Sequence, residues 1–84
     1  MSKITKLAFA TEDIFYGSVA IRIVGFREIY IENFLGILTF SEEKLKLLSR
    51  DGVVDISGHN MHIDCYQDNY LHLKGKICGI SYIE

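Results

Sequence analysis

The sequence has 84 residues, of which 49% are hydrophobic, and it carries a formal net charge of −2 at pH 7. This length allows one domain with one modest core, and the composition is that of a globular protein. The negative charge argues against a nucleic-acid-binding protein, which needs a basic stripe. No run of basic residues occurs, so electrostatic attachment to an anionic membrane is not indicated.

The chain also lacks the sequence features of a secreted or membrane-spanning protein. No apolar stretch approaches the roughly 20 residues that cross a bilayer, and no apolar segment of a secretory signal follows the charged N-terminus. We therefore expect a cytoplasmic protein without direct membrane insertion. The two cysteines, Cys65 and Cys78, are too few for a disulfide scaffold, and alternation places Cys65 among inward-facing core residues.

The chain divides into a weakly patterned start and a strongly patterned remainder. Residues 1–17 show no sustained period, and we expect a partly ordered N-terminal arm there. Over residues 18–84, apolar and polar side chains alternate with a period of two, and turn sequences interrupt the alternation every 8–12 residues or so. The pattern predicts strands over residues 18–24, 27–33, 37–40, 44–48, 53–57, 61–66, 70–74 and 76–83.

Turns are expected where glycine or asparagine permits unusual backbone angles. In the last strand, a bulge at Gly79 would reconcile the opposite phases of Ile77 and Ile80. The pair Asp51-Gly52 is a strong hairpin signal. The remaining structural turns are assigned to Gly25, Asn33, Gly36, Gly58 and Gly75.

The segment Ser41-Glu42-Glu43 leaves two local structures open. Ser41 is a good helix N-cap, but Lys44 stands where a capping box has Glu or Gln. The leucines that follow fit helical and strand spacing alike. Since the distance to the next turn is short, we favour a tight turn followed by a strand over residues 44–48. The fold class predicted from the whole pattern is all-β, a small antiparallel β-sandwich built from short meander strands.

Two histidines and a carboxylate form the most prominent candidate metal site. If Tyr66 pairs with Tyr70 across the turn between them, Asp64 faces His72 and His62 faces Lys74 on the polar side of the sheet. Such side chains could hold zinc, but Lys74 opposes a cation, and the spacing matches no closed zinc motif. We therefore favour cross-strand polar pairing over a metal site.

An interaction face is better supported than a catalytic site. Glu28 and Glu32 share one strand face with Tyr30 between them, and nothing suggests a pocket for acid–base work. No glycine-rich phosphate loop occurs, so we expect no enzyme and no cofactor. The aromatic residues exceed what so small a core buries, and exposed tyrosine is favoured at interfaces. The expected face consists of Glu28, Tyr30, Glu32, Tyr66 and Tyr70; the alternative is that the tyrosines only cover the sheet.

Several runs together carry a family resemblance. They are Ile21–Gly25, Glu28–Asn33, Gly36–Leu38, Phe40, Ser41–Glu43, Gly52, Ile56–Gly58, Gly75–Ile77 and Ile80–Tyr82. On these runs, residues 18–84 resemble the YabP/YqfC family of sporulation proteins, and Tyr30-Ile31-Glu32-Asn33 brings them closer to the YqfC branch. The first 17 residues match poorly, because a Leu-Pro segment is usual there and this chain has no proline.

The resemblance implies a role in endospore formation, in the mother cell, peripheral to the outer membrane around the forespore, in spore cortex or coat development. It also implies a protein partner such as a YqfD-type membrane protein, while the small core allows a homo-oligomer. We therefore predict a non-enzymatic assembly or adaptor module.

The family supplies no catalytic or cofactor residues. The positions carried over are structural: Gly25, Glu32, Asn33, Gly36, Gly58 and Gly75. The alternative function is a small metal- or ligand-binding β module that uses His62, Asp64 and His72.

Overall fold

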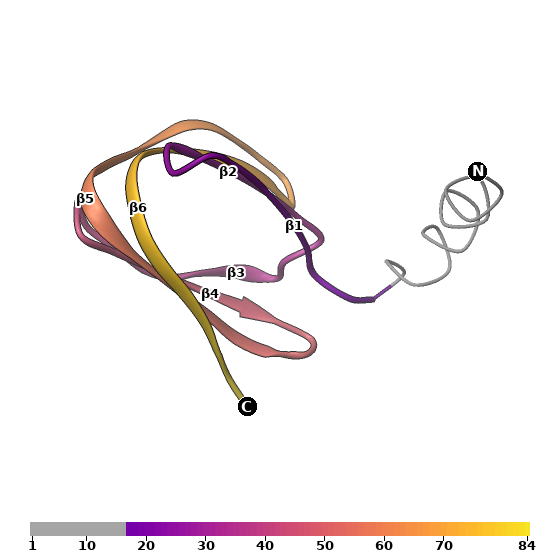
Figure 1. Ribbon diagram of the computed structural model, residues 1–84. Coiled ribbons are helices and arrows are strands. Elements are labelled where there is room, and N and C mark those ends of the chain that lie inside the picture. The colour runs from indigo at the N-terminus through magenta and orange to yellow at the C-terminus, as the bar shows by residue number, and fades with distance from the viewer. Residues whose placement is uncertain (1–16) are drawn as a thin grey trace, which may run out of the picture.

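The computed structural model describes residues 17–84, which form one antiparallel six-stranded sheet (Figure 1). Neighbouring strands follow the order β1-β2-β6-β5-β4-β3. The expected N-terminal arm lies almost entirely outside the described residues. In the described part no helix is long and apolar enough to cross a membrane. The strands are β1 (Ala20–Val24), β2 (Glu28–Glu32), β3 (Gly36–Phe40), β4 (Lys44–Ser49), β5 (Gly52–Gln67) and β6 (Tyr70–Ile83).

The predicted all-β fold is confirmed, but the strands form one continuous, unclosed sheet rather than two separate ones. β5 and β6 are long and curve around the interior (Figure 1). β2 pairs with the first part of β6, and β4 pairs with the first part of β5. The sheet therefore has a first half around β1 and β2 and a second half around β3 and β4, joined through β5 and β6.

Gly58 and Gly75 lie inside these long strands, so the turns expected at both positions are wrong. The β5–β6 register is irregular next to Gly58 and between His59 and His62, where the sheet bends. A Cβ atom on Gly58 would collide with the carbonyl oxygen of Lys76, and one on Gly75 would lie 2.7 Å from the Cα of Met61. These glycines permit the close backbone approach that the bend requires.

Two turns close over the bend through backbone hydrogen bonds. From the β3–β4 turn, Glu43 accepts the N–H of Gly58 at 3.1 Å. From the β1–β2 turn, Arg27 accepts the N–H of Gly75 at 3.0 Å, and Phe26 accepts the N–H of Ile77 at 2.7 Å. The β1–β2 turn is thereby fixed against the bend of β6.

Both halves of the sheet contribute to a single core. Their inward side chains form one cluster of buried residues, most of them fully inaccessible. Burying each leucine, isoleucine or valine contributes about 1.5–3 kcal/mol relative to leaving it exposed. The fully buried aliphatic residues are Ile29, Ile31, Leu71 and Leu73 from the first half and Leu45, Leu47, Val54 and Ile56 from the second.

Several local predictions are confirmed. The Ser41 hydroxyl accepts the N–H groups of Glu43 and Lys44 at 3.2 and 3.1 Å, which makes a tight turn before strand β4. Asn33 has a φ of 66°, as a turn asparagine can. The break in phase expected at Gly79 lies beside it, since Ser57 pairs with Gly79 while Gly58 pairs with Ile77.

Candidate functional site

The outward face of the first half gathers polar side chains from four strands. The register places Arg22 of β1 beside Tyr30 of β2, and Tyr30 beside His72 of β6. One row further along, Glu28 pairs with Lys74. Because paired residues of antiparallel strands project to the same side, these side chains lie next to one another.

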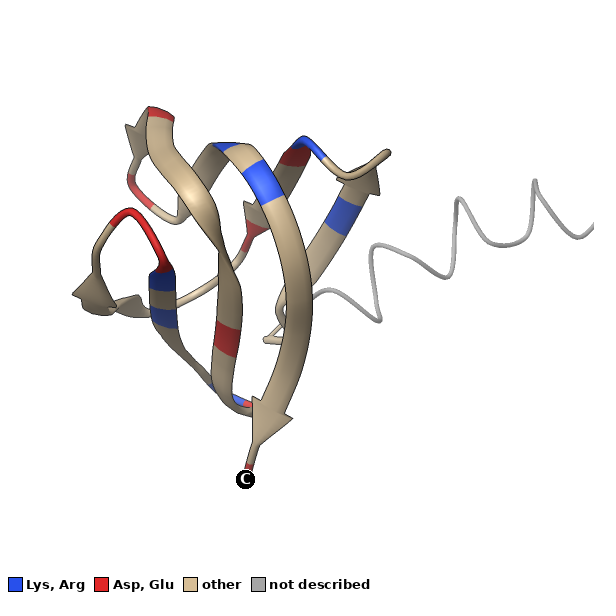
Figure 2. Cartoon of the chain, turned by 60° about the vertical axis from the view of Figure 1, so that its left-hand side comes forward, with Lys and Arg blue, Asp and Glu red and all other residues tan. Residues whose placement is uncertain are grey.

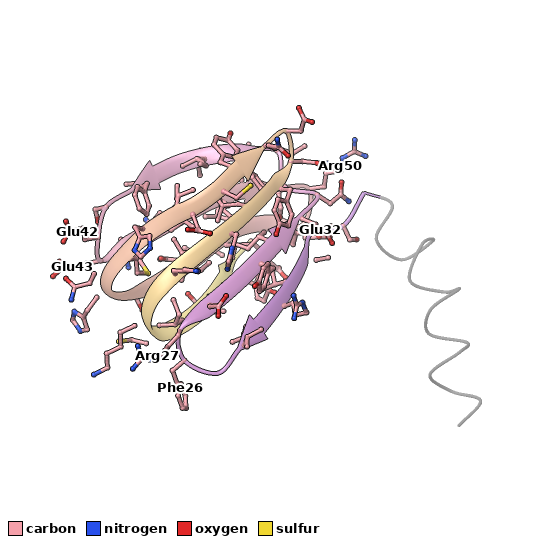
Figure 3. The ribbon with its side chains drawn as sticks, turned by 90° about the horizontal axis from the view of Figure 1, so that it is seen from above. Phe26, Arg27, Glu32, Glu42, Glu43 and Arg50 are labelled. Atoms are coloured by element: carbon pink, nitrogen blue, oxygen red, sulfur yellow. The ribbon has the colours of Figure 1, made fainter. Side chains whose placement is uncertain are left out.

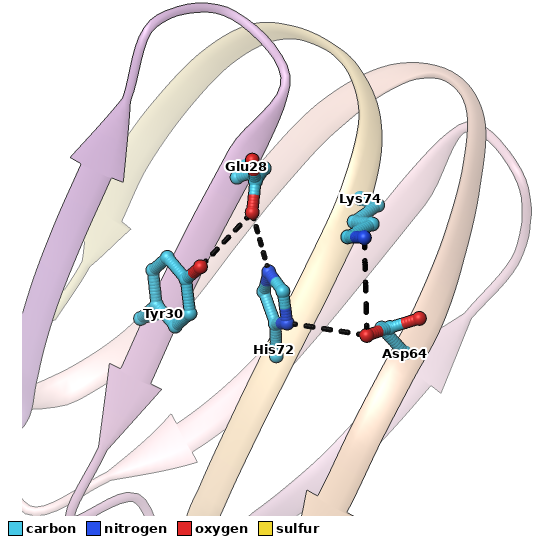
Figure 4. A network of polar contacts seen from close by, with 5 residues as sticks. All are labelled: Glu28, Tyr30, Asp64, His72 and Lys74. Atoms are coloured by element: carbon cyan, nitrogen blue, oxygen red, sulfur yellow. Dashed lines mark hydrogen bonds and ion pairs between the residues drawn. The ribbon is translucent and has the colours of Figure 1, made fainter.

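A network of polar contacts connects this face (Figure 4). The Tyr30 hydroxyl donates to Oε1 of Glu28 at 2.9 Å, and Nε2 of His72 lies 2.9 Å from the same oxygen. On the other side of the ring, Nδ1 of His72 lies 3.4 Å from Oδ2 of Asp64, and Lys74 Nζ lies 4.0 Å from that oxygen. Since an ionised carboxylate only accepts hydrogen bonds, Nε2 of His72 donates to Glu28.

Aromatic stacking holds the same residues in place. The rings of Tyr30 and His72 are nearly parallel, at 11°, with centroids 4.1 Å apart. The guanidinium carbon of Arg22 lies 4.2 Å from the centroid of Tyr30, within the range of a cation–π contact. His72 is only 8% exposed; its ring stacks on Tyr30 and lies between the carboxylates of Glu28 and Asp64. The face is therefore held in one arrangement by contacts within the chain.

The network changes the acidity of two of its members. Hydrogen bonding to His72, and secondarily to Tyr30, lowers the pKa of Glu28. Hydrogen bonding to the Glu28 carboxylate raises the pKa of Tyr30, because that bond requires the hydroxyl proton. Glu28 is thus held as an anion, and Tyr30 as a neutral donor.

Four of the five residues expected in an interaction face share this surface. Glu28 and Tyr30 bond to each other, and Glu32 pairs with Tyr70 in the adjacent row. A hollow of about 440 Å³ lies beside the β1 edge, and its lining includes Tyr30, Glu32, Tyr70 and Arg22.

The fifth residue, Tyr66, does not belong to this surface. The direct pairing of Tyr66 with Tyr70 is wrong, because the register shifts between Ile63 and Cys65 and Tyr66 pairs with Leu71. Tyr66 consequently turns to the inner side, where its ring stacks with that of buried Phe34 at a centroid distance of 6.0 Å.

The same shift corrects the expectation for Cys65. This residue pairs with His72 on the outward side and is half-buried, so it is not a core residue. The shift also keeps Asp64 on the outward face, where it contacts His72 as the pattern predicts, and His62 pairs with Lys74 as expected.

The metal reading of His62, Asp64 and His72 finds no support in this geometry. Among residues 17–84, no group of three or more His, Cys, Asp and Glu side chains could hold a metal ion. Both ring nitrogens of His72 already face carboxylates, and Lys74 lies beside Asp64. The arrangement is a set of cross-strand polar pairs.

Sequence reasoning missed the contact that organises the site, Glu28 with His72. These residues are 44 positions apart, and they meet because β2 pairs with β6 rather than with β3. The meander order that we expected from the sequence keeps β2 and β6 apart. The signal that could have found the contact is the polar parity of Glu28, Tyr30, His72 and Lys74 on two strands.

Comparison with known proteins identifies the family. The model of the YabP family matches residues 17–84. The chain is similar to the uncharacterized protein YqfC of Bacillus subtilis (strain 168), with 36% identity over 72 residues, which cover 86% of this chain and 77% of that protein. No solved structure matches the chain significantly. The family match covers every described residue, and the chain belongs to the YabP family.

Proposed function

We propose that this protein is a non-enzymatic assembly or adaptor module in sporulation, and that it binds a protein partner through the outward face of β1, β2 and β6. The observation that carries the proposal is the ordered network of Tyr30, Glu28 and His72 beside the tyrosine-lined hollow. A rigid surface with tyrosine and arginine side chains loses little conformational entropy on binding. Such a surface is suited to protein recognition.

The chemistry of the face supports recognition over catalysis. A general acid or base needs a pKa near the working pH and access to a substrate proton. The pKa of Glu28 is instead lowered, and its Oε1 already accepts from Tyr30 and faces His72. The groups that could transfer protons are occupied by one another.

Membership of the YabP family supports a sporulation-related protein. We propose that the module acts in the mother cell, peripheral to the membrane around the forespore, in cortex or coat development, as the family resemblance implies. The partner that we propose is a membrane protein of the YqfD type, with a second copy of the chain as a further possible binding partner.

The test is recruitment of a fluorescent fusion in sporulating cells, with and without the neighbouring YqfD-type protein. We expect Tyr70→Ala and Tyr30→Ala to weaken binding to that protein at least about fivefold, the effect of an interface residue worth more than 1 kcal/mol or so. Tyr82→Ala is the matched control, because Tyr82 is 62% exposed on the second half of the sheet. Unchanged recruitment of the Tyr30 and Tyr70 variants would show that the chosen face is wrong.

A further inference from the structure

A second hollow, of about 400 Å³, lies at the bend of the sheet and adjoins the proposed interaction face at Glu28. Three segments that are distant in the sequence form its wall: the β1–β2 turn, the bend of β5 and the bend of β6. The wall includes the side chains of Arg27, His59, His62, Lys74 and Lys76.

Positive charge in this hollow is poorly compensated. Among residues 17–84, neither Arg27 nor Lys76 takes part in an ion pair, and Lys74 approaches Asp64 only to 4.0 Å. The lining includes one carboxylate, Glu28, which pairs with Lys74 across β2 and β6, so the uncompensated charges are those of Arg27 and Lys76. Uncompensated cations that converge on a hollow create a local positive potential, which attracts anions even when the net charge of the protein is negative.

An exposed aromatic side chain stands next to these cations. Phe26, at the tip of the β1–β2 turn, is 79% exposed, and it lines an adjoining hollow with Arg27 and Lys76. Figure 3 shows Phe26 and Arg27 projecting from the same end of the sheet, with Glu42 and Glu43 at the neighbouring corner. The acidic pair does not line the basic hollow.

The exposed Phe26 ring beside the cations distinguishes two sources of a bound anion, a free phosphate ion and the surface of a lipid bilayer. A free phosphate ion would be bound by the cations alone and would leave Phe26 in water. A lipid surface offers phosphate groups to the cations and an apolar region to the phenyl ring, as the interface of a bilayer does. We propose that this end of the molecule docks on an anionic bilayer, with lipid phosphates at Arg27 and Lys76 and Phe26 at the level of the acyl boundary.

The fold explains why the sequence did not indicate this surface. The basic residues come from three separate segments, and no stretch of the chain is itself polybasic. Figure 2 shows basic segments in blue at the end of the molecule away from the C-terminus, with acidic segments in red interspersed among them. The docking is peripheral, because it uses one turn and the flanking side chains and requires no membrane-spanning element.

The experiment is vesicle co-sedimentation of the purified chain, with phosphatidylcholine vesicles that contain or lack phosphatidylglycerol. We expect binding only with phosphatidylglycerol, weakened by salt. A juxtamembrane cation contributes about fivefold to membrane affinity, so the Arg27→Gln/Lys76→Gln double variant should bind about thirtyfold more weakly. Phe26→Ser should also bind more weakly while it keeps the salt dependence.

The matched control is the Lys46→Gln/Arg50→Gln double variant, which removes the same net charge at residues that do not line the hollow. Equal loss in this control, or unchanged binding of the Arg27 and Lys76 variant, overturns the proposal. Binding of inorganic phosphate without binding of vesicles overturns the lipid source, and binding of neither overturns the proposal as a whole. Because Tyr30 and Tyr70 are unchanged and no partner protein is present, failure here does not affect the proposed adaptor function.

Discussion

At the scale of single residues, Glu28 connects strands that no local sequence pattern joins. Its carboxylate accepts from Tyr30 within β2 and from His72 on β6. The aromatic stack and the Arg22 guanidinium restrict the rings that make these bonds. The order of the proposed interaction face therefore depends on the charge of one half-buried side chain.

The first prediction concerns that charge. The pKa of Glu28 is lowered from 4.5 by His72 and Tyr30, so the ionised carboxylate stabilises the folded state. The contribution is complete above the pKa of the unfolded chain and is lost as the pH falls through the lower folded pKa. We expect Glu28→Gln to unfold at a lower temperature at neutral pH and to lose less stability than the wild type on acidification from pH 4.5 downward.

Thermal unfolding at a series of pH values checks this prediction, with Glu32→Gln as the control, because Glu32 is an exposed carboxylate of the same strand. Glu28→Gln should also lower the pKa of Tyr30, since the hydrogen bond to the Glu28 carboxylate is the main cause that raises this pKa. Titration of tyrosinate absorbance reports this change, and Tyr30→Phe identifies the contribution of Tyr30. Parallel acid profiles of wild type and Glu28→Gln would contradict the role given to Glu28.

At the scale of elements, the sequence predicts the short strands well but divides each of the two long strands, β5 and β6, into two. Alternation identifies β1 to β4 to within one or two residues, and Asp51-Gly52 correctly marks the β4–β5 connection. The sequence predicts chain reversals at Gly58 and Gly75, because glycine permits both a turn and a close backbone approach. Only the strand that lies against the glycine distinguishes a turn from a close backbone approach, and the local sequence does not show which strand that is.

The orientation of Tyr66 was mispredicted for a related reason. The bulge between Ile63 and Cys65 reverses the phase of the strand, and no glycine in that stretch marks it. Four of the five residues expected in the interaction face nevertheless share it, because β2 has a regular period and its register with β6 is uninterrupted. His72 was absent from the predicted face, because its place beside Tyr30 follows from the pairing of β2 with β6, which the sequence does not reveal.

The second prediction tests the bend. In Gly58→Ala the new methyl group meets the Lys76 carbonyl oxygen and the sulfur of Met61, and backbone cannot move aside as a flexible side chain can. We expect a loss of about 1–3 kcal/mol in the free energy of unfolding, the usual cost of overpacking. Gly36→Ala is the control, since nothing lies within 4 Å of its new methyl group. Denaturant unfolding measures both, and equal stability of the two variants would show that the bend does not need glycine.

At the scale of the whole molecule, the two halves of the sheet are not separate units. They share the long strands β5 and β6, and their inward side chains form one core. The proposed interaction face lies on the first half and the basic hollow at the bend, so both surfaces depend on the same packing. A domain of this size has only a few kcal/mol of stability to lose.

The third prediction follows from this shared core. Leu73 belongs to the first half and Leu45 to the second, and both are fully buried. Each substitution, Leu73→Ala or Leu45→Ala, should cost about 2–5 kcal/mol. Because the halves share their strands, either variant should unfold as a whole, with coincident transitions in far-ultraviolet circular dichroism and tyrosine fluorescence. Leu35→Ala, at a leucine that is 57% exposed, should change stability little. A variant in which one half keeps its amide protection while the other exchanges freely would instead show two independent units joined by β5 and β6.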